Sequence, residues 1–93
     1  MKEKITTGSG NVFADLGFSA EEAVVLGMRS QLMCDLELLI AKRGWTQAQA
    51  AKELRIAQSR VSDLVRGKWD KFSLDMLIEL ATRAGCKVSL AMA

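Results

Sequence analysis

The sequence lacks several residues on which common chemistries depend. It contains no histidine, tyrosine or proline, and its two cysteines, Cys34 and Cys86, are far apart in the chain. A zinc site or a haem attachment site needs histidine or closely spaced cysteines, so neither is expected. Small domains held together by disulfides usually have several bridges, which favours two free thiols here.

Catalytic patterns are also missing. No nucleophile with a neighbouring base, no glycine-rich phosphate loop and no paired carboxylates suited to acid–base chemistry can be recognised. We therefore expect a protein that is not an enzyme, with no cofactor, no metal and no evident small-molecule ligand.

No apolar run approaches the ~18 residues needed to cross a bilayer. The first ten residues, MKEKITTGSG, contain two lysines with no apolar segment behind them, unlike a signal peptide. These features predict a cytoplasmic protein that does not associate with membranes. The chain length of 93 residues is sufficient for one small domain.

The net charge of +2 conceals an uneven distribution. Residues 41–72 contain eight positive and three negative side chains, a net charge of +5, whereas the rest of the chain contains five positive and eight negative ones, a net charge of −3. The basic segment is a candidate for binding a polyanion.

Capping signals divide residues 19–85 into four helices. Ser19 with Glu22, and Thr46 with Gln49, have the spacing of capping boxes, and Ser73 is a further N-cap candidate. Apolar spacing predicts helices near residues 19–43, 46–54, 58–66 and 73–85. The buried stripe of the first helix is expected at Val25, Leu32, Leu36, Leu39 and Ile40.

The two ends of the chain are expected to differ from this helical domain. Residues 1–18 are interpreted as a flexible segment with a short apolar anchor, which either folds back or docks on a partner; the anchor consists of Val12, Phe13, Leu16 and Phe18. In residues 86–93, apolar and small or polar residues alternate, which predicts a short C-terminal β-strand. Its apolar residues Val88, Leu90 and Met92 favour pairing in a dimer, while pairing within the chain or with a partner protein stays open.

Residues 46–67 have the pattern of a helix-turn-helix motif. Two short helices joined by a tight turn cross steeply, so their contact needs small side chains, which Ala50 and Ala51 provide. Ile56, Val61 and Leu64 complete a small core. The second helix of such a motif lies in the DNA major groove.

The opposite face of that second helix is densely polar. Gln58 and Arg60 can form paired hydrogen bonds with adenine and guanine respectively. The residues expected to read bases are Gln58, Ser59, Arg60, Ser62 and Asp63. Those expected to contact phosphates are Arg43, Gln47, Lys52, Arg66, Lys68 and Lys71. Trp69, between these positive charges, is expected to pack against the loop and the fourth helix rather than to stack on a base.

The stretches TQAQAAKEL, IAQSRVSDLVRG and FSLDMLIELATRAG resemble the phage-repressor (Cro/XRE-type) helix-turn-helix family. The resemblance covers about residues 32–85 and implies a mostly α, lambda-repressor-like domain of four or five helices. Two positions depart from the family pattern. Arg55 occupies the turn position that is usually glycine, and Ala57 the cap position that is usually serine or threonine.

The segments NVFADLGF and EEA before the motif, together with the terminal CKVSLAMA, narrow the resemblance to the HigA-type antitoxins. This resemblance implies a homodimeric repressor that binds a near-palindromic operator in double-stranded DNA, regulates its own operon and neutralises a RelE/HigB-like ribonuclease toxin. Two alternatives remain: a stand-alone phage- or plasmid-type regulator without a toxin, and a protein-interaction module that no longer binds DNA.

Overall fold

The computed structural model describes residues 15–92, which form four α-helices and one short 3-10 helix. The elements are α3 (Ala20–Lys42), α4 (Gln47–Leu54), α5 (Gln58–Val65), η1 (Trp69–Lys71) and α6 (Leu74–Arg83). The expected helical domain is therefore confirmed in this part of the chain. The predictions made for Val12, Phe13 and the rest of residues 1–14 lie outside the described residues.

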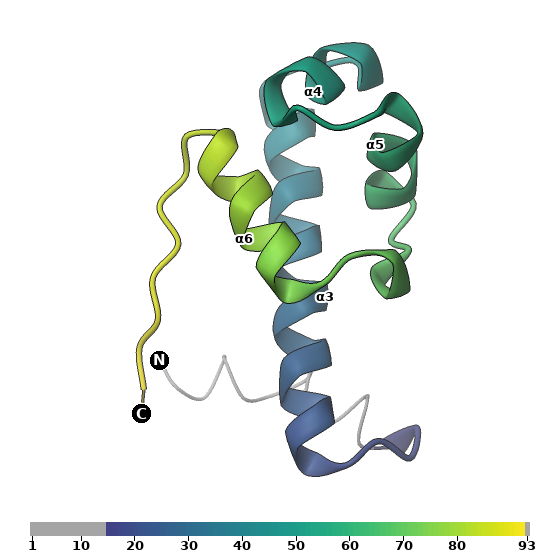
Figure 1. Ribbon diagram of the computed structural model, residues 1–93, viewed down its shortest axis with the longest axis vertical. Helices are drawn as coiled ribbons and strands as arrows, with labels where there is room; N and C mark the ends of the chain where they lie inside the picture. The colour runs from purple at the N-terminus through teal and green to yellow at the C-terminus, as the bar shows by residue number, and fades with distance from the viewer. Residues whose placement is uncertain (1–14, 93) are drawn as a thin grey trace.

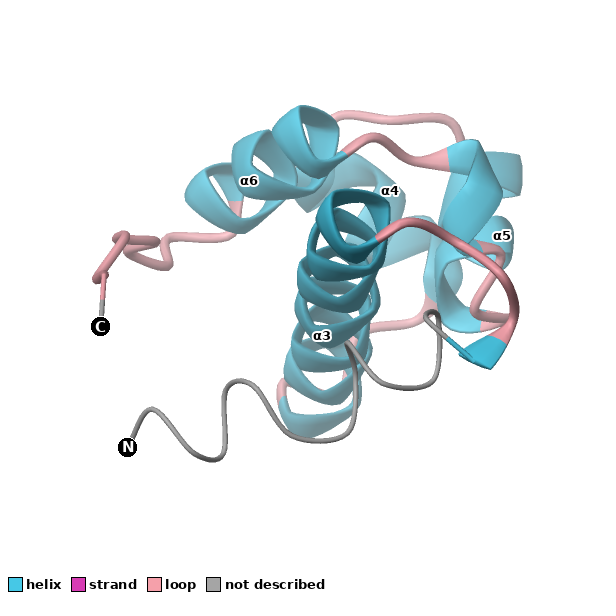
Figure 2. Cartoon of the chain, turned by 90° about the horizontal axis from the view of Figure 1, so that it is seen from below, coloured by secondary structure: helices cyan, strands magenta, loops and turns pink. Residues whose placement is uncertain are grey.

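Helix α3 runs along the molecule and supports the other elements (Figure 1). Helices α5 and α6 and the 3-10 helix η1 pack against it, and α4 packs against α5 and α6. One apolar core joins all four helices: Met33, Leu36, Ile40, Ala50, Leu54, Val61, Leu64, Phe72, Leu77, Leu80, Ala81 and Ala84. Helix α5 and the C-terminal segment lie on opposite sides of the molecule, as Figures 1 and 2 both show.

Helix α3 begins with the predicted capping box. The Glu22 amide donates to the Ser19 hydroxyl at 3.1 Å, and the Ser19 amide donates to the Glu22 carboxylate at 3.0 Å. The second bond lowers the pKa of Glu22 below its ordinary value. Its contribution to folding is thus present above the unfolded-state pKa and is lost as the pH falls through the lowered folded-state pKa.

Of the predicted buried stripe of α3, Leu36 and Ile40 are buried and Leu32 and Leu39 half-buried, but Val25 is wrong. Val25 is 42% exposed, whereas Ala23 and Leu26 are buried and pack against Trp69. In the described structure the N-terminal part of α3 packs against Trp69 of η1 through Ala23 and Leu26, so burial there follows the position of Trp69 rather than the register of the C-terminal part.

The predicted C-terminal strand is absent from the described part of the chain. Residues 86–92 have no regular secondary structure, and Val88, Leu90 and Met92 are exposed. A strand requires a neighbour that satisfies its backbone groups, and residues 15–92 contain no other extended segment that pairs with this one. At the start of this segment, the Cys86 amide donates to the Ala81 carbonyl at the end of α6 at 2.9 Å.

The turn between α4 and α5 has the two predicted departures from an ideal motif. Arg55 adopts a left-handed conformation with φ 58° and ψ 47°, and it is the one non-glycine residue with positive φ among those described. A side chain in this conformation costs about 1 kcal/mol. Ala57 occupies the N-cap position of α5 and provides no side-chain hydrogen bond there.

Replacing Arg55 by glycine should remove the strain of the left-handed conformation. Arg55→Ala is the matched control, because it removes the same charge but retains a β-carbon. We expect Arg55→Gly to be about 1 kcal/mol more stable than Arg55→Ala in urea unfolding. Equal stability of the two variants would show that this turn is not strained.

Candidate nucleic-acid interface

Helices α4 and α5 form a helix-turn-helix unit. Ala50, Val61 and Leu64 have no exposed surface where the helices meet, and Ile56 in the turn is half-buried against the same core. The Thr46–Gln49 capping box is present, with bonds of 3.1 and 2.9 Å, so α4 begins where the sequence predicts. The inward positions of α5 are therefore occupied, and its remaining positions form an outer face.

The outer face of α5 is most exposed in the first turn of the helix. Gln58 and Ser59 are exposed, whereas Ser62 and Asp63 are half-buried. An amide side chain at an exposed helix N-terminus has the reach and the donor–acceptor pair needed to bind an adenine edge. The base-reading role of all five predicted residues stays a prediction, and Gln58 and Ser59 are the two most accessible for it.

Exposed cations surround this face. Lys52 lies in the last turn of α4, Arg66 follows α5, Lys68 precedes the 3-10 helix η1, and Lys71 is the last residue of η1. Gln47 is exposed in the first turn of α4, where free amide groups and the helix dipole favour a phosphate. The role of these residues in contacting phosphates stays a prediction.

A model of a helix-turn-helix domain family matches residues 12–93 of the chain. The protein belongs to this helix-turn-helix domain family. Neither the curated proteins nor the solved structures include one that matches the chain. The family indicates a DNA-binding regulator, in agreement with the exposed polar face of α5. Within residues 15–92, no helix combines the length and apolar character needed to cross a membrane.

One predicted phosphate residue of the helix-turn-helix domain contacts a different part of the protein. The Arg43 guanidinium donates from Nη1 to the Ala84 carbonyl at 2.7 Å, and its Cζ lies 5.1 Å from the centre of the Trp45 ring. Arg43 thus connects the end of α3 to the end of α6. Its predicted phosphate contact stays a prediction, but this side chain already has two partners within the protein.

Arg60 also contacts the protein itself. Its Nη2 donates to the Lys71 carbonyl at 3.1 Å, and its Cζ lies 4.6 Å from the centre of the Phe72 ring. The side chain is half-buried, in contrast to Gln58 and Ser59 beside it. Of the five residues expected to read bases, Arg60 is the one in the described structure whose side chain donates a hydrogen bond to another segment, at the end of η1, and it also contacts the Phe72 ring that follows.

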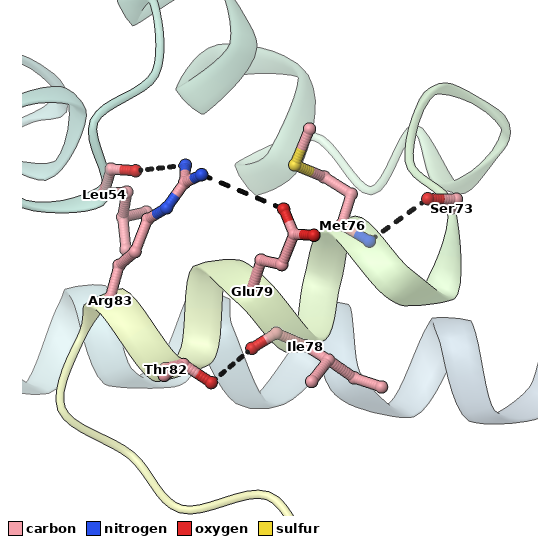
Figure 3. Close-up of polar contacts among 7 residues, drawn as sticks. All are labelled: Leu54, Ser73, Met76, Ile78, Glu79, Thr82 and Arg83. Atoms are coloured by element: carbon pink, nitrogen blue, oxygen red, sulfur yellow. Dashed lines mark hydrogen bonds and ion pairs between the residues drawn. The ribbon is translucent and has the colours of Figure 1, made fainter.

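Two further arginines position this interface, and sequence reasoning did not identify either. Arg83 donates from Nη1 to the Leu54 carbonyl at 3.0 Å and lies 3.8 Å from Glu79, so α6 holds the C-terminal end of α4 (Figure 3). Arg29 donates from Nη1 to the Trp69 carbonyl at 3.5 Å. The acceptors are main-chain carbonyls, which a side-chain pattern does not reveal.

Trp69 is half-buried and packs against α3 as well as the main core. The expectation that Trp69 packs within the protein is confirmed for the described structure, and its neighbours include Ala23 and Leu26 of α3 in addition to the expected loop and fourth helix. The tryptophan ring therefore joins η1 to the N-terminal half of α3.

Proposed function

We propose that the protein is a non-catalytic, sequence-specific repressor that binds a near-palindromic operator in double-stranded DNA as a homodimer. The observation that carries this proposal is the exposed first turn of α5, with Gln58 and Ser59, surrounded by exposed cations. Lysine and arginine supply affinity for phosphates, and the polar turn supplies discrimination between bases. Both belong to a helix-turn-helix domain whose core leaves this face uncovered.

The C-terminal segment supports the homodimer. Val88, Leu90 and Met92 are 41%, 88% and 97% exposed, and they alternate with smaller or polar residues. Two copies of the segment can pair as an antiparallel ladder, satisfying backbone groups that a single copy leaves open. Because the segment lies opposite α5, such a dimer keeps both reading helices free (Figure 2). A two-fold dimer places reading helices about 34 Å apart on DNA.

The N-terminal half of α3 supports the further proposal of an antitoxin. Its side chains Val24, Val25 and Met28 are 52%, 42% and 40% exposed. Residues 15–40 contain five negative and one positive side chain, a net charge of −4. We name the exposed residues Val24, Val25 and Met28, with Glu21 and Glu22, the acidic apolar face. It repels DNA and complements a basic, apolar protein surface, in accordance with the RelE/HigB-like toxin that the HigA resemblance implies.

Two other functions compete with this one. A stand-alone phage- or plasmid-type regulator would bind the same kind of operator and have no toxin partner. A protein-interaction module would retain the fold and bind no DNA. A neighbouring gene for a small basic protein favours the antitoxin, and failure to bind any DNA at low salt favours the interaction module.

Base reading by α5 is tested by Gln58→Ala in gel-shift assays on the DNA upstream of the gene. Loss of a paired contact to adenine should cost roughly 1–3 kcal/mol on the preferred sequence and relax the preference at one base position. Lys68→Met is the control for a phosphate contact. It should weaken binding to all sequences alike and lower the salt slope by about one. A uniform loss for Gln58→Ala would contradict base reading by this residue.

The proposed dimer is tested by replacing Val88, Leu90 and Met92 together with serine. Sedimentation should then show monomers, and operator affinity should fall sharply because one subunit contacts one half-site. The control variant carries Lys87→Ser, Ser89→Thr and Ala91→Ser, which changes the alternate positions of the same segment. An unchanged mass for the apolar triple variant would remove this segment from the interface.

Where a growth-inhibiting basic protein is encoded beside the gene, the acidic apolar face is tested by co-expression with it. The wild-type chain should restore growth, whereas the double variant Val25→Ser, Met28→Ser should not, because the partner loses its apolar contacts. Leu38→Ser is the matched control, since Leu38 is also exposed on α3 but lies outside this face. Operator binding should be unchanged in both variants. Equal rescue by both would contradict the assignment of the face.

A further inference from the structure

We propose that Arg60 is a positioning residue for DNA recognition rather than a base-reading one. Its guanidinium fastens the first turn of α5 to residues 68–72, so that the reading helix and the lysines Lys68 and Lys71 meet DNA as one rigid unit. This inference rests on the proposed DNA binding, and it replaces the expectation that Arg60 reads guanine.

The contacts of Arg60 hold its guanidinium against the protein, whereas guanine recognition needs it to point outward. Paired hydrogen bonds to guanine require two N–H groups of the guanidinium fork, directed away from the protein. Here Nη2 donates to the Lys71 carbonyl, and the face of the guanidinium lies over the Phe72 ring, with its Cζ 4.6 Å from the ring centre. A distance below about 6 Å to the ring centre is typical of a cation–π contact.

The burial of these groups shows that Arg60 lies against the protein. Phe72 is only 2% exposed, and the Arg60 guanidinium lies over its ring. The Arg60 Nε atom is itself buried, without a hydrogen-bond partner among the described residues. To reach a base edge, the side chain would have to leave the Lys71 carbonyl and uncover an aromatic ring that belongs to the core.

Residues 68–72 are held at two more points. The Lys68 amide donates to the Asp63 carbonyl of α5 at 3.0 Å, and Arg29 of α3 donates to the Trp69 carbonyl at 3.5 Å. Arg60 is the side chain that links this segment to the start of α5, where Gln58 and Ser59 are exposed. The distance between the base-reading turn and the two lysines therefore depends on Arg60.

Two consequences separate this role from base reading. Losing Arg60 should weaken binding to every sequence by a similar factor, because the preferred base at each position is set by other side chains. Losing Phe72 should have the same effect without any change of charge. In both cases Lys68 and Lys71 are no longer held in a fixed position relative to α5. The salt slope of binding should therefore fall by about one to two.

The test is a double-mutant cycle of Arg60→Met and Phe72→Leu. Methionine keeps an apolar stem without the guanidinium, and leucine keeps the core apolar without the ring face. Urea unfolding without DNA measures the coupling of the two residues, and binding to an operator library at several salt concentrations measures preference and salt slope. Arg66→Met is the matched control, since it removes one exposed arginine just beyond the same helix.

We expect a coupling of about three- to fivefold in the unfolding equilibrium constant, which corresponds to an exposed-to-partly-buried cation–π contact. Arg66→Met should show no coupling to Phe72. Arg60→Met and Phe72→Leu should leave base preferences unchanged and lower the salt slope. Relaxed preference at a single base position in Arg60→Met, or a salt slope unaffected by Phe72→Leu, would overturn the proposal.

If Phe72→Leu does not fold, the base preferences of Arg60→Met alone distinguish the two roles. A wild-type chain that binds no DNA overturns the proposed function instead. The coupling measured by unfolding then still decides whether Arg60 fastens residues 68–72 to α5, because that measurement needs no DNA.

Discussion

Where α4 crosses α5, Ala50, Val61 and Leu64 have no exposed surface, and the placement of α5 depends on this contact. The small side chain of Ala50 lets the two backbones approach closely, and Val61 and Leu64 fill the space that remains against the core. Since these inward positions are fixed by packing, the first turn of α5 must face outward. The exposure of Gln58 and Ser59 is thus a consequence of the core and needs no stabilising contact of its own.

Arginine side chains stabilise the arrangement of the helices by donating hydrogen bonds to main-chain carbonyls at the ends of other elements. A helix leaves the carbonyls of its last turn without partners inside the helix. Arg83 donates to Leu54 at the end of α4, Arg43 to Ala84 at the end of α6, and Arg60 to Lys71 at the end of η1. The bonds of Arg83 and Arg43 join helices that are distant in the sequence, and that of Arg60 joins two consecutive elements. The arginines that give the chain a basic character therefore divide into those that hold the domain together and those, such as Arg66, that stay exposed.

The charge asymmetry of the chain has a structural counterpart. The basic residues 41–72 form α4, α5 and η1, whereas the acidic residues 15–40 belong mainly to α3. The first set has the charge needed to approach DNA, and the second repels it. Trp69 and Arg29 connect the two, because Trp69 of η1 packs against the N-terminal half of α3 and Arg29 of α3 donates to the Trp69 carbonyl. One small domain in this way presents a basic side, which includes the polar face of α5, and a separate acidic apolar face.

The sequence by itself determined the features that depend on near neighbours. The capping boxes at Ser19 and Thr46, the left-handed Arg55 and the uncapped start of α5 all follow from residues within one or two turns. The tertiary structure alone decided the exposure of Val25, the partners of Arg43 and Arg60, and the absence of a strand in residues 86–92. These features depend on which main-chain groups and surfaces meet from distant parts of the chain. Side-chain periodicity does not predict these contacts, because every residue has the same main-chain carbonyl acceptor.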